Sequence, residues 1–349
     1  MAPSRERVEP DSGVSRRTED LGHAQAMGIT LDTEIRDRLS EVEERLRKVL
    51  ADAEHQAVAS GTSYLIAAGG KRVRPRLALL GAQFGDPENP RVIDAAVITE
   101  LVHVATLHHD DVMDGAQRRH GVPTANALWG NGMAVLLGDL LLARAAELGA
   151  DLGLRALRLQ TTTLARLVRG QLLEAAGPQS GKDPMEHALG VMADKSSSLI
   201  SMAVELGAQV AGADELTCAA LARFGEHLGL AFQISDDVID ICSPATESGK
   251  TPGTDLREGV VTVPVLHALA ADGPAADRLR TILARGPVTD PDLHAEALGL
   301  LRASPGMLAA RADVDRHVQA AREELMALPA IPARAALDGL AGFVRTRNA

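Results

Sequence analysis

The segment ELVHVATLHHDDVMD, residues 100–114, decides the fold because an apolar helical run ends in a cluster of acids. On a helix, Asp110 and Asp114 lie four residues apart and share a face, whereas Asp111 points ~100° away. Three carboxylates within five residues repel one another on a half-buried helix. The pattern therefore predicts a helix that binds a cation at its end.

The same acidic pattern returns in FQISDDVID, residues 232–240, with Asp236, Asp237 and Asp240. Mg²⁺ binds one or two carboxylates together with water and phosphate oxygens. The two clusters together predict a Mg²⁺-dependent site for a highly charged anion. The alternative is two solvated acidic patches. The EF-hand spacing D-x-D-x-D-G is absent from both clusters, which excludes that kind of calcium site.

The rest of the chain favours helices packed on helices. Aromatic residues make up 2% of the sequence, so Ala, Leu, Val and Ile must form the core. We expect one all-α domain over 29–349, a helical bundle, preceded by a disordered tail over 1–28, which lacks apolar periodicity. Helices are expected near 32–58, 74–85, 90–115, 132–150, 154–176, 184–211, 215–242, 260–272, 289–303, 307–327 and 332–346.

Composition excludes several classes of protein. The formal net charge of −11 argues against a nucleic-acid partner, which needs a basic surface. The sequence has no apolar run of the ~18 residues that a transmembrane helix requires, and no secretory signal is expected. Cys218 and Cys242 are too few for a disulfide framework. We therefore expect a cytoplasmic protein.

Basic residues near turns are candidate phosphate ligands. Lys71 and Arg74 lie in GGKRVRP, residues 69–75, where a glycine turn opens a helix whose amino end attracts anions. Arg119 and His120 follow the first acidic motif, and Lys250 lies in a Gly/Pro-rich loop after the second. Each position, taken alone, is also compatible with an ordinary charged surface.

In their order along the chain, these segments resemble the trans-isoprenyl diphosphate synthases, or polyprenyl synthetases. The resemblance extends from about residue 30 to the end of the chain. The matching segments are GGKRVRP (69–75), HDDVMD (109–114), RRHGVPTAN (118–126), WGN (129–131), AVLLGD (134–139), GQLLE (170–174), DKSS (194–197), FQISDDVID (232–240) and GKTPGTDLREG (249–259).

The resemblance implies an isoprenoid synthase fold, a helical bundle around a deep central cavity, usually assembled as a homodimer. It implies head-to-tail condensation of isopentenyl diphosphate with an allylic diphosphate. About three Mg²⁺ ions per active site would bind the allylic diphosphate. Their ligands would be Asp110, Asp114 and Asp236, with support from Asp111, Asp237 and Asp240.

The resemblance also assigns roles to other polar residues. Positive charge beside the allylic diphosphate is expected from Arg119, Lys195 and Lys250, of which Lys195 and Lys250 are catalytic candidates. Isopentenyl diphosphate is expected on Lys71, Arg74, His103 and His120. Polar groups near the allylic carbon are expected to be Gln171, Ser196 and Gln233, and Gln233 is a further catalytic candidate.

Two positions depart from the family pattern. His120 stands where most relatives have a second arginine, and Val260 stands where many have a lysine. Neutral imidazole binds phosphate less well than guanidinium does. We expect altered substrate affinity rather than loss of activity, because both acidic motifs are complete. The C-terminal Arg345 and Arg347 could reach the active site when substrate binds, but free surface charge is the preferred interpretation.

Product length is expected to depend on the residues before the first acidic motif. Short-chain relatives commonly place aromatics at positions that Ala105 and Thr106 occupy here. Thr106 lies one turn from Asp110 on the same face, with Val102 deeper, so these residues predict a long product of roughly six to ten isoprene units. Leu137 or Leu141 on a facing helix are alternative plugs, which would make a geranylgeranyl- or farnesyl-length product.

Two other functions share some of these features. A class I terpene cyclase has one aspartate-rich helix, but it usually has a pocket of aromatics and a different second metal motif. A silent partner subunit of a heteromeric synthase tends to have lost an acidic motif. The complete pair of motifs and the scarcity of aromatics favour the synthase.

Overall fold

The protein is a helical bundle. The computed structural model describes residues 12–51, 61–62, 64–66, 69–119, 121–242 and 252–347, with side chains from residue 30 onward. Within this part of the chain, the strands are limited to the short antiparallel pair β1 (Arg118–Arg119) and β2 (Val122–Pro123). The predicted all-α, single-domain architecture is confirmed. No helix among the described residues is long and apolar enough to cross a membrane.

The centre of the bundle contains α3 (Val73–Ala82), α4 (Arg91–Met113), α9 (Ser198–Val210) and α10 (Glu215–Cys242). Glycines allow some of these helices to touch along their backbones. A Cβ atom on Gly207 would lie 1.8 Å from the carbonyl oxygen of Ala78, and one on Gly225 would lie 2.5 Å from Cα of Ser201. Close backbone contact replaces the aromatic side chains that the sequence lacks.

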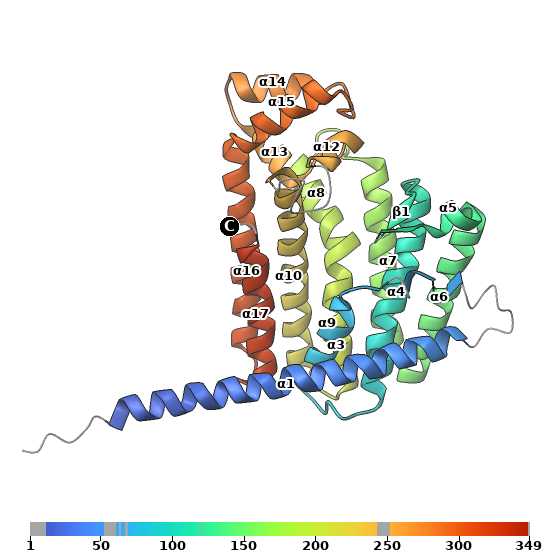
Figure 1. Ribbon diagram of the computed structural model, residues 1–349, viewed down its shortest axis with the longest axis vertical. Helices are drawn as coiled ribbons and strands as arrows, with labels where there is room; N and C mark the ends of the chain where they lie inside the picture. Colours follow the sequence, from blue (N-terminus) through green and yellow to red (C-terminus); the bar gives the residue numbers. More distant parts are fainter. Residues whose placement is uncertain are drawn as a thin grey trace, which may run out of the picture.

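Other helices cover the centre on two flanks (Figure 1). One flank has α5 (Ala125–Trp129), α6 (Asn131–Leu152) and α7 (Leu154–Ala176), and the other has α16 (Pro305–Met326) and α17 (Pro332–Thr346). The remaining elements are α8 (Pro184–Met192), the π-helical turn η1 (Ala193–Ser197), α12 (Thr254–Glu258), α13 (Val263–Ala270), α14 (Pro274–Leu283) and α15 (Pro291–Arg302).

Helix α1 (Ser12–Ala51) lies across one end of the bundle and extends beyond it (Figure 1). The backbone is thus helical from Ser12, within the segment 1–28 that the sequence predicts to be disordered. Good helix formers such as Arg, Glu, Ala and Met let the packed helix continue outward. Residues 1–11 lie outside the described residues, so the domain boundary at residue 28 stays a prediction. The buried face of α1 consists of Leu31, Ile35, Val42, Leu46 and Leu50.

The helices differ from the predicted ones in local structure, and the short helices α5 and α12 lie in segments where none was predicted. The segment predicted as one helix over 184–211 is interrupted by η1, which divides it into α8 and α9. Helix α14 was not predicted, because only a short stripe of Ala276, Leu279 and Ile282 faces the core. Proline occupies the first turn of α14, α15, α16 and α17, where its missing N–H costs no helical hydrogen bond.

Candidate active site

Both acidic motifs lie at the carboxyl ends of long central helices. Asp114 follows the last residue of α4, and Asp240 lies in the last turn of α10. Figure 1 shows these ends toward the same end of the bundle, the end that carries β1 and α12. The carboxyl end of a helix is partially negative, so carboxylates there are destabilised unless a cation joins them. The placement of both motifs therefore favours cation binding.

In the first motif, Asp110 is half-buried, Asp111 is fully buried and Asp114 is exposed. Burial raises the pKa of Asp110, and the neighbouring carboxylates of Asp114 and Glu174 contribute to the increase. The positive charge of Lys195 opposes it without cancelling it. The carboxylates of this motif therefore lack sufficient positive charge, which is the condition under which a metal ion binds.

The hairpin of β1 and β2 returns Arg119 to the first motif. Its Nε donates to Oδ1 of the buried Asp111 at 2.7 Å. The turn begins at Gly115, whose φ of 62° suits glycine, and Asn126 Nδ2 donates to the Asp111 carbonyl oxygen at 3.2 Å. Asp111 therefore holds Arg119 beside the motif. The adjacent His120 lies outside the described residues.

In the second motif, two aspartates anchor the chain that follows. Asp237 Oδ2 accepts from the backbone N–H of Val263 at 3.2 Å, and Asp240 Oδ1 accepts from that of Thr254 at 3.2 Å. Burial raises the pKa of Asp237 well above its ordinary value, although the hydrogen bond from Val263 opposes this. Asp237 and Asp240 thus hold the starts of α13 and α12, and Asp236 is the motif's exposed carboxylate.

Arg347, at the carboxyl end of α17, binds the second motif. Its Nη2 lies 2.7 Å from Asp236 Oδ1, its Nε donates to Ser235 Oγ at 2.6 Å, and its guanidinium carbon lies 4.0 Å from the Phe232 ring centroid. Arg345 pairs with an aspartate of α16 at 2.8 Å. Arg345 lies on the surface, in an exposed ion pair. The preferred expectation of a free surface charge is wrong for Arg347, whose contact with Asp236 agrees with the alternative that it reaches the site. The cause is tertiary, because α17 packs against α10.

A cavity of about 510 Å³ lies below the first motif, between α4, α6 and α7. Its polar end is formed by His109, Asp110, Asp139, Gln171 and Lys195. Its remaining walls are largely apolar and are formed by Thr106, Val112, Met113, Val135, Leu142, Leu164, Leu167, Val168 and Leu172. The cavity therefore places charged and apolar side chains along one groove, and Met113, Val168 and Leu172 on its apolar part are more than half exposed. A ligand with a charged head and a hydrocarbon tail has the same division.

Lys195 reaches the mouth of this cavity from η1. Its Nζ lies 2.5 Å from Glu174 Oε2, and its charge opposes the increase that burial causes in the pKa of the nearby Asp110. Gln171, one turn before Glu174 on α7, also lines the cavity, and its Oε1 is buried without a hydrogen-bond partner in the structure. Ser196 is half-buried beside Lys195 on the same turn. A cation and polar groups thus stand beside the first motif.

The basic segment before α3 contains one structural arginine. Arg72, with φ 46°, places Nε 2.5 Å from Glu43 and Nη1 2.7 Å from the buried Glu100, so it joins α1, α3 and α4. Lys71 is exposed. Burial lowers the pKa of Arg74 to about 10, against the opposing charge of Glu100. Unlike Arg72, Lys71 and Arg74 are therefore candidates to bind an anionic ligand.

Other predicted site residues have less defined surroundings. His103 is half-buried on α4, two turns before Asp110, and is not among the residues that line the described cavity. Gln233 is half-buried on α10, one turn before Asp237. Lys250 lies outside the described residues.

The three residues predicted to control product length differ in their surroundings. Thr106 lines the cavity, and its Oγ1 donates to the carbonyl oxygen of His103. Ala105 and Val102 are fully buried in the core. The alternative plugs Leu137 and Leu141 are also buried and do not line this cavity, whereas Leu142, on the same helix, does.

Sequence reasoning missed several residues at the mouth of the cavity. Asp139 lies 3.4 Å from His109 Nε2, and Glu174 binds Lys195. A Cβ atom on Gly138 would lie 2.3 Å from His109 Nε2, so this glycine makes room for the imidazole. Asp139 and Glu174 belong to matched segments of the family pattern. That match was the available signal for them.

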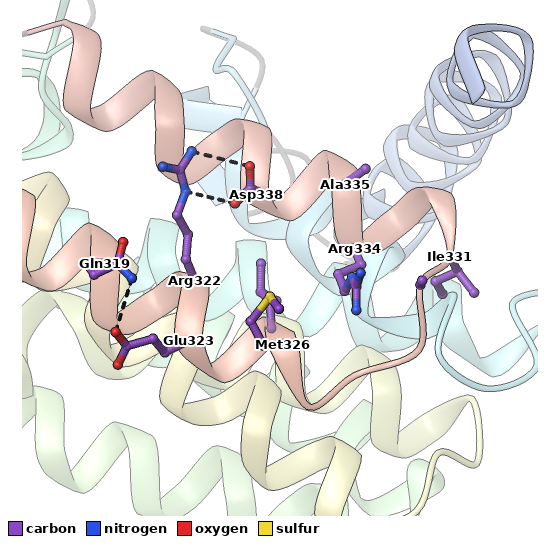
Figure 2. A pocket seen from close by; sticks show the side chains of 10 residues that line it. Gln319, Arg322, Glu323, Met326, Ile331, Arg334, Ala335 and Asp338 are labelled. Carbon is purple, nitrogen blue, oxygen red and sulfur yellow. Dashed lines mark hydrogen bonds and ion pairs between the residues drawn. The ribbon is translucent and has the colours of Figure 1, made fainter. Parts of the chain in front are cut away.

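A second hollow, of about 740 Å³, lies between α16 and α17. Figure 2 shows Arg322 paired with Asp338 there, and Gln319 hydrogen-bonded to Glu323. Its lining contains no residue of either acidic motif. Its charged groups are largely paired with each other, so the smaller cavity beside Asp110 is the better candidate site.

Comparison with known proteins agrees with this geometry. Residues 55–300 match the family model described as polyprenyl synthetase. Nonaprenyl diphosphate synthase of Mycobacterium tuberculosis is 45% identical over 90% of this chain and 93% of its own. The chain therefore belongs to the polyprenyl synthetase family and is a prenyltransferase.

Solved structures give the same result for the fold. Geranylgeranyl pyrophosphate synthase of Corynebacterium glutamicum, solved with calcium and isoprenyl diphosphate, has a TM-score of 0.83 and 43% identity, covering 91% of this chain and 97% of its own. Decaprenyl diphosphate synthase of Rhodobacter capsulatus has a TM-score of 0.84 and 34% identity, covering 92% and 99%. Proteins similar to this chain thus carry names of both short and long products.

Proposed function

We propose that this prenyltransferase condenses isopentenyl diphosphate head-to-tail with an allylic diphosphate and releases an all-trans polyprenyl diphosphate. The observation that carries the proposal is the cavity that places Asp110 and Lys195 along one groove with apolar side chains. An allylic diphosphate has the same division, with a charged head and a hydrocarbon tail. The family membership of the chain supports the same reaction.

The chain's own residues favour ionisation of the allylic substrate. Breaking the C–O bond puts negative charge on the departing diphosphate, and Lys195 and Arg119 stand beside Asp110, where that charge develops. Interactions that strengthen as charge develops lower the barrier. Gln171 would present a polar group near the forming cation, and the apolar side chains around it carry no nucleophile that would trap it. The alkene of isopentenyl diphosphate then attacks the allylic carbon to form the new C–C bond, and the departed diphosphate accepts the proton that is lost.

Lys195 and Arg119 must exchange partners when substrate binds. In this structure, Lys195 contacts Glu174 and Arg119 contacts Asp111. Both pairs keep a cation close to the first motif. A diphosphate offers several oxygens to each cation, which favours the exchange.

We propose that Mg²⁺ is held by Asp110, Asp114 and Asp236, with about three ions per active site. Asp111, Asp237 and Asp240 support these carboxylates. In the described part of the chain, no three His, Cys, Asp or Glu side chains stand ready to hold a metal ion by themselves. Mg²⁺ shares its coordination with phosphate oxygens and water, so it needs only one or two protein carboxylates. When bound, Mg²⁺ would supply positive charge to the leaving diphosphate.

Isopentenyl diphosphate is proposed to bind Lys71 and Arg74, with His103 and His120 nearby. Arg74 supports this role because its Nε is buried without a hydrogen-bond partner in the structure. Arg72 is excluded from this group because its guanidinium is bound to Glu43 and Glu100.

The product is proposed to be long. Thr106, the lining residue one turn below Asp110, is small and leaves the cavity unblocked there, in keeping with a product of roughly six to ten isoprene units. The nonaprenyl and decaprenyl synthases among the similar proteins support this length. A geranylgeranyl synthase is also similar to this chain, at 43% identity, so a product of geranylgeranyl length is the second candidate.

One assay tests the reaction and its product together. Purified protein is incubated with Mg²⁺, labelled isopentenyl diphosphate and either farnesyl or geranylgeranyl diphosphate. Long polyprenyl diphosphates on a chromatogram would support the proposal. Cyclic hydrocarbons would instead indicate a terpene cyclase, and turnover only after addition of a second protein would indicate a partner subunit.

We also propose a homodimer in the cytoplasm. Leu128 and Trp129 on α5, and Met133 and Leu136 on α6, are exposed apolar side chains on one flank. Exposed apolar stripes of this kind commonly mark subunit interfaces. Two cysteines are too few for a disulfide framework, which fits a reducing compartment. Sedimentation of Leu136→Glu tests the interface: a monomer supports it, and an unchanged dimer contradicts it.

A further inference from the structure

The π-helical turn η1 is the element that carries Lys195 to the cavity. A π-helical turn is a turn of α-helix with one extra residue. Such turns are rare in proteins, and those that occur often lie at functional sites. The extra residue displaces the side chains that follow it around the helix axis. Lys195 lies within this turn, so its direction depends on keeping the turn intact.

A buried aspartate in this turn is held by two arginines of α7. Asp194 Oδ1 accepts from Arg166 Nε at 3.0 Å, and Asp194 Oδ2 accepts from Arg169 Nε at 2.6 Å. Arg169 Nη2 also donates to Asp194 Oδ1 at 2.8 Å, which makes its contact bidentate. Burial raises the pKa of Asp194, but the two arginines outweigh burial and lower it overall. The carboxylate is therefore ionised and fully engaged.

Arg166 extends this network to α10, the helix of the second acidic motif. Its guanidinium makes two hydrogen bonds to Glu226, and Nη2 also donates to the Ala193 carbonyl oxygen at 3.2 Å. A single arginine thus joins α7, η1 and α10. The hydrogen bond with Glu226 raises the pKa of Arg166, despite its partial burial.

Glycines let the same turn sit against both neighbouring helices. A Cβ atom on Gly170 of α7 would lie 2.6 Å from the backbone nitrogen of Lys195, and one on Gly229 of α10 would lie 2.5 Å from Cα of Ser197. The turn η1 is thus packed closely between α7 and α10 at the position of Lys195. A shift of η1 would move the lysine relative to Asp110.

We propose that Asp194, Arg166 and Arg169 are positioning residues that fix the π-helical turn so that Lys195 reaches the diphosphate bound at the first acidic motif. This inference rests on the proposed function, because it gives Lys195 a role in that reaction. Asp194 acts only through the turn, because its carboxylate binds the two arginines and does not line the cavity.

The test is a double-mutant cycle in the full-length protein. We expect Asp194→Asn to lower kcat about 100-fold, as a displacement of about 1 Å in a reacting group does. In a Lys195→Ala background, the same substitution should lower kcat less than about 3-fold, since the lysine it positions is gone. KM for isopentenyl diphosphate, which binds elsewhere, should stay within a factor of about two.

Arg169→Gln guards against a folding defect, because the Arg169 side chain is 61% exposed. It should lower kcat about 10-fold, again only when Lys195 is present, and Arg169→Lys should restore part of the loss. The matched control is Arg223→Gln, which removes a 56% exposed arginine paired with Glu324 and should leave kcat unchanged.

The possible outcomes separate this inference from the proposed function. A wild type without prenyltransferase activity overturns the proposed function and the inference with it. An active wild type in which Asp194→Asn and Lys195→Ala act independently on kcat overturns only the positioning role. Equal falls in kcat for Arg169→Gln and Arg223→Gln would also overturn it.

Discussion

Residues 105 and 106 are adjacent on α4, yet phenylalanine is expected to change product length at position 106 and stability at position 105. Thr106 lines the cavity about 6 Å along the helix below Asp110. A phenyl ring there would block the shaft close to its mouth. We expect Thr106→Phe to make short-chain products, with a change in stability below about 1 kcal/mol because the ring enters existing space.

Ala105 is fully buried, and its carbonyl oxygen would lie 3.1 Å from a Cβ atom on Gly138 of α6. The benzyl group of Ala105→Phe would have to enter a packed helix contact. Overpacking of this kind costs about 1–3 kcal/mol, which lowers the melting temperature by several degrees. We expect this variant to be less stable, with products close to wild-type length.

Product chromatography and thermal denaturation of both variants check this pair of predictions. Thr106→Val is the control, because it keeps the size of the side chain and should leave product length unchanged. The reasoning would be refuted if Ala105→Phe shortened the product at unchanged stability, or if Thr106→Phe left it long.

Three further predictions concern charge. Arg72→Ala should cost about 3–5 kcal/mol in urea denaturation by leaving Glu100 buried without its partner, and a double variant with Glu100→Met should recover part of this loss. Asp110→Asn should abolish activity yet raise the melting temperature of the metal-free protein. Because the pKa of Asp110 is higher in the folded protein than its ordinary value of 3.8, ionisation of this carboxyl costs stability as the pH rises from 3.8 through the folded-state pKa. The increase in melting temperature should therefore be present at pH 7 and absent below pH 3.8. Arg347→Gln should lower the Mg²⁺ concentration for half-maximal activity by freeing Asp236; an unchanged Mg²⁺ titration would contradict this.

The sequence predicted the helical class and the position of both acidic motifs because these depend on local patterns. Helical periodicity and the order of motifs are readable along the chain. The direction of Thr106 followed similarly from its distance of one turn from Asp110. Lys195 and Gln171 could be selected by their resemblance to family motifs, and the structure brings both to the cavity.

Features that join distant segments could not be predicted in this way. Arg72 resembles its neighbours Lys71 and Arg74, and only the packing of α1 against α4 shows that it is buried on Glu43 and Glu100. The contact of Arg347 with Asp236 likewise depends on the packing of α17 against α10, which the sequence does not show. The turn η1 escaped prediction because one extra residue does not disturb an apolar pattern enough to be seen.

The two acidic motifs are proposed to bind one diphosphate between them. A crystal structure with Mg²⁺ and a non-reactive thiolo analogue of an allylic diphosphate would show this directly. We predict a single diphosphate, with metal ions bridging it to Asp110 on one side and Asp236 on the other, and its hydrocarbon tail passing Thr106. A diphosphate held by one motif alone, with the other facing solvent, would contradict the account.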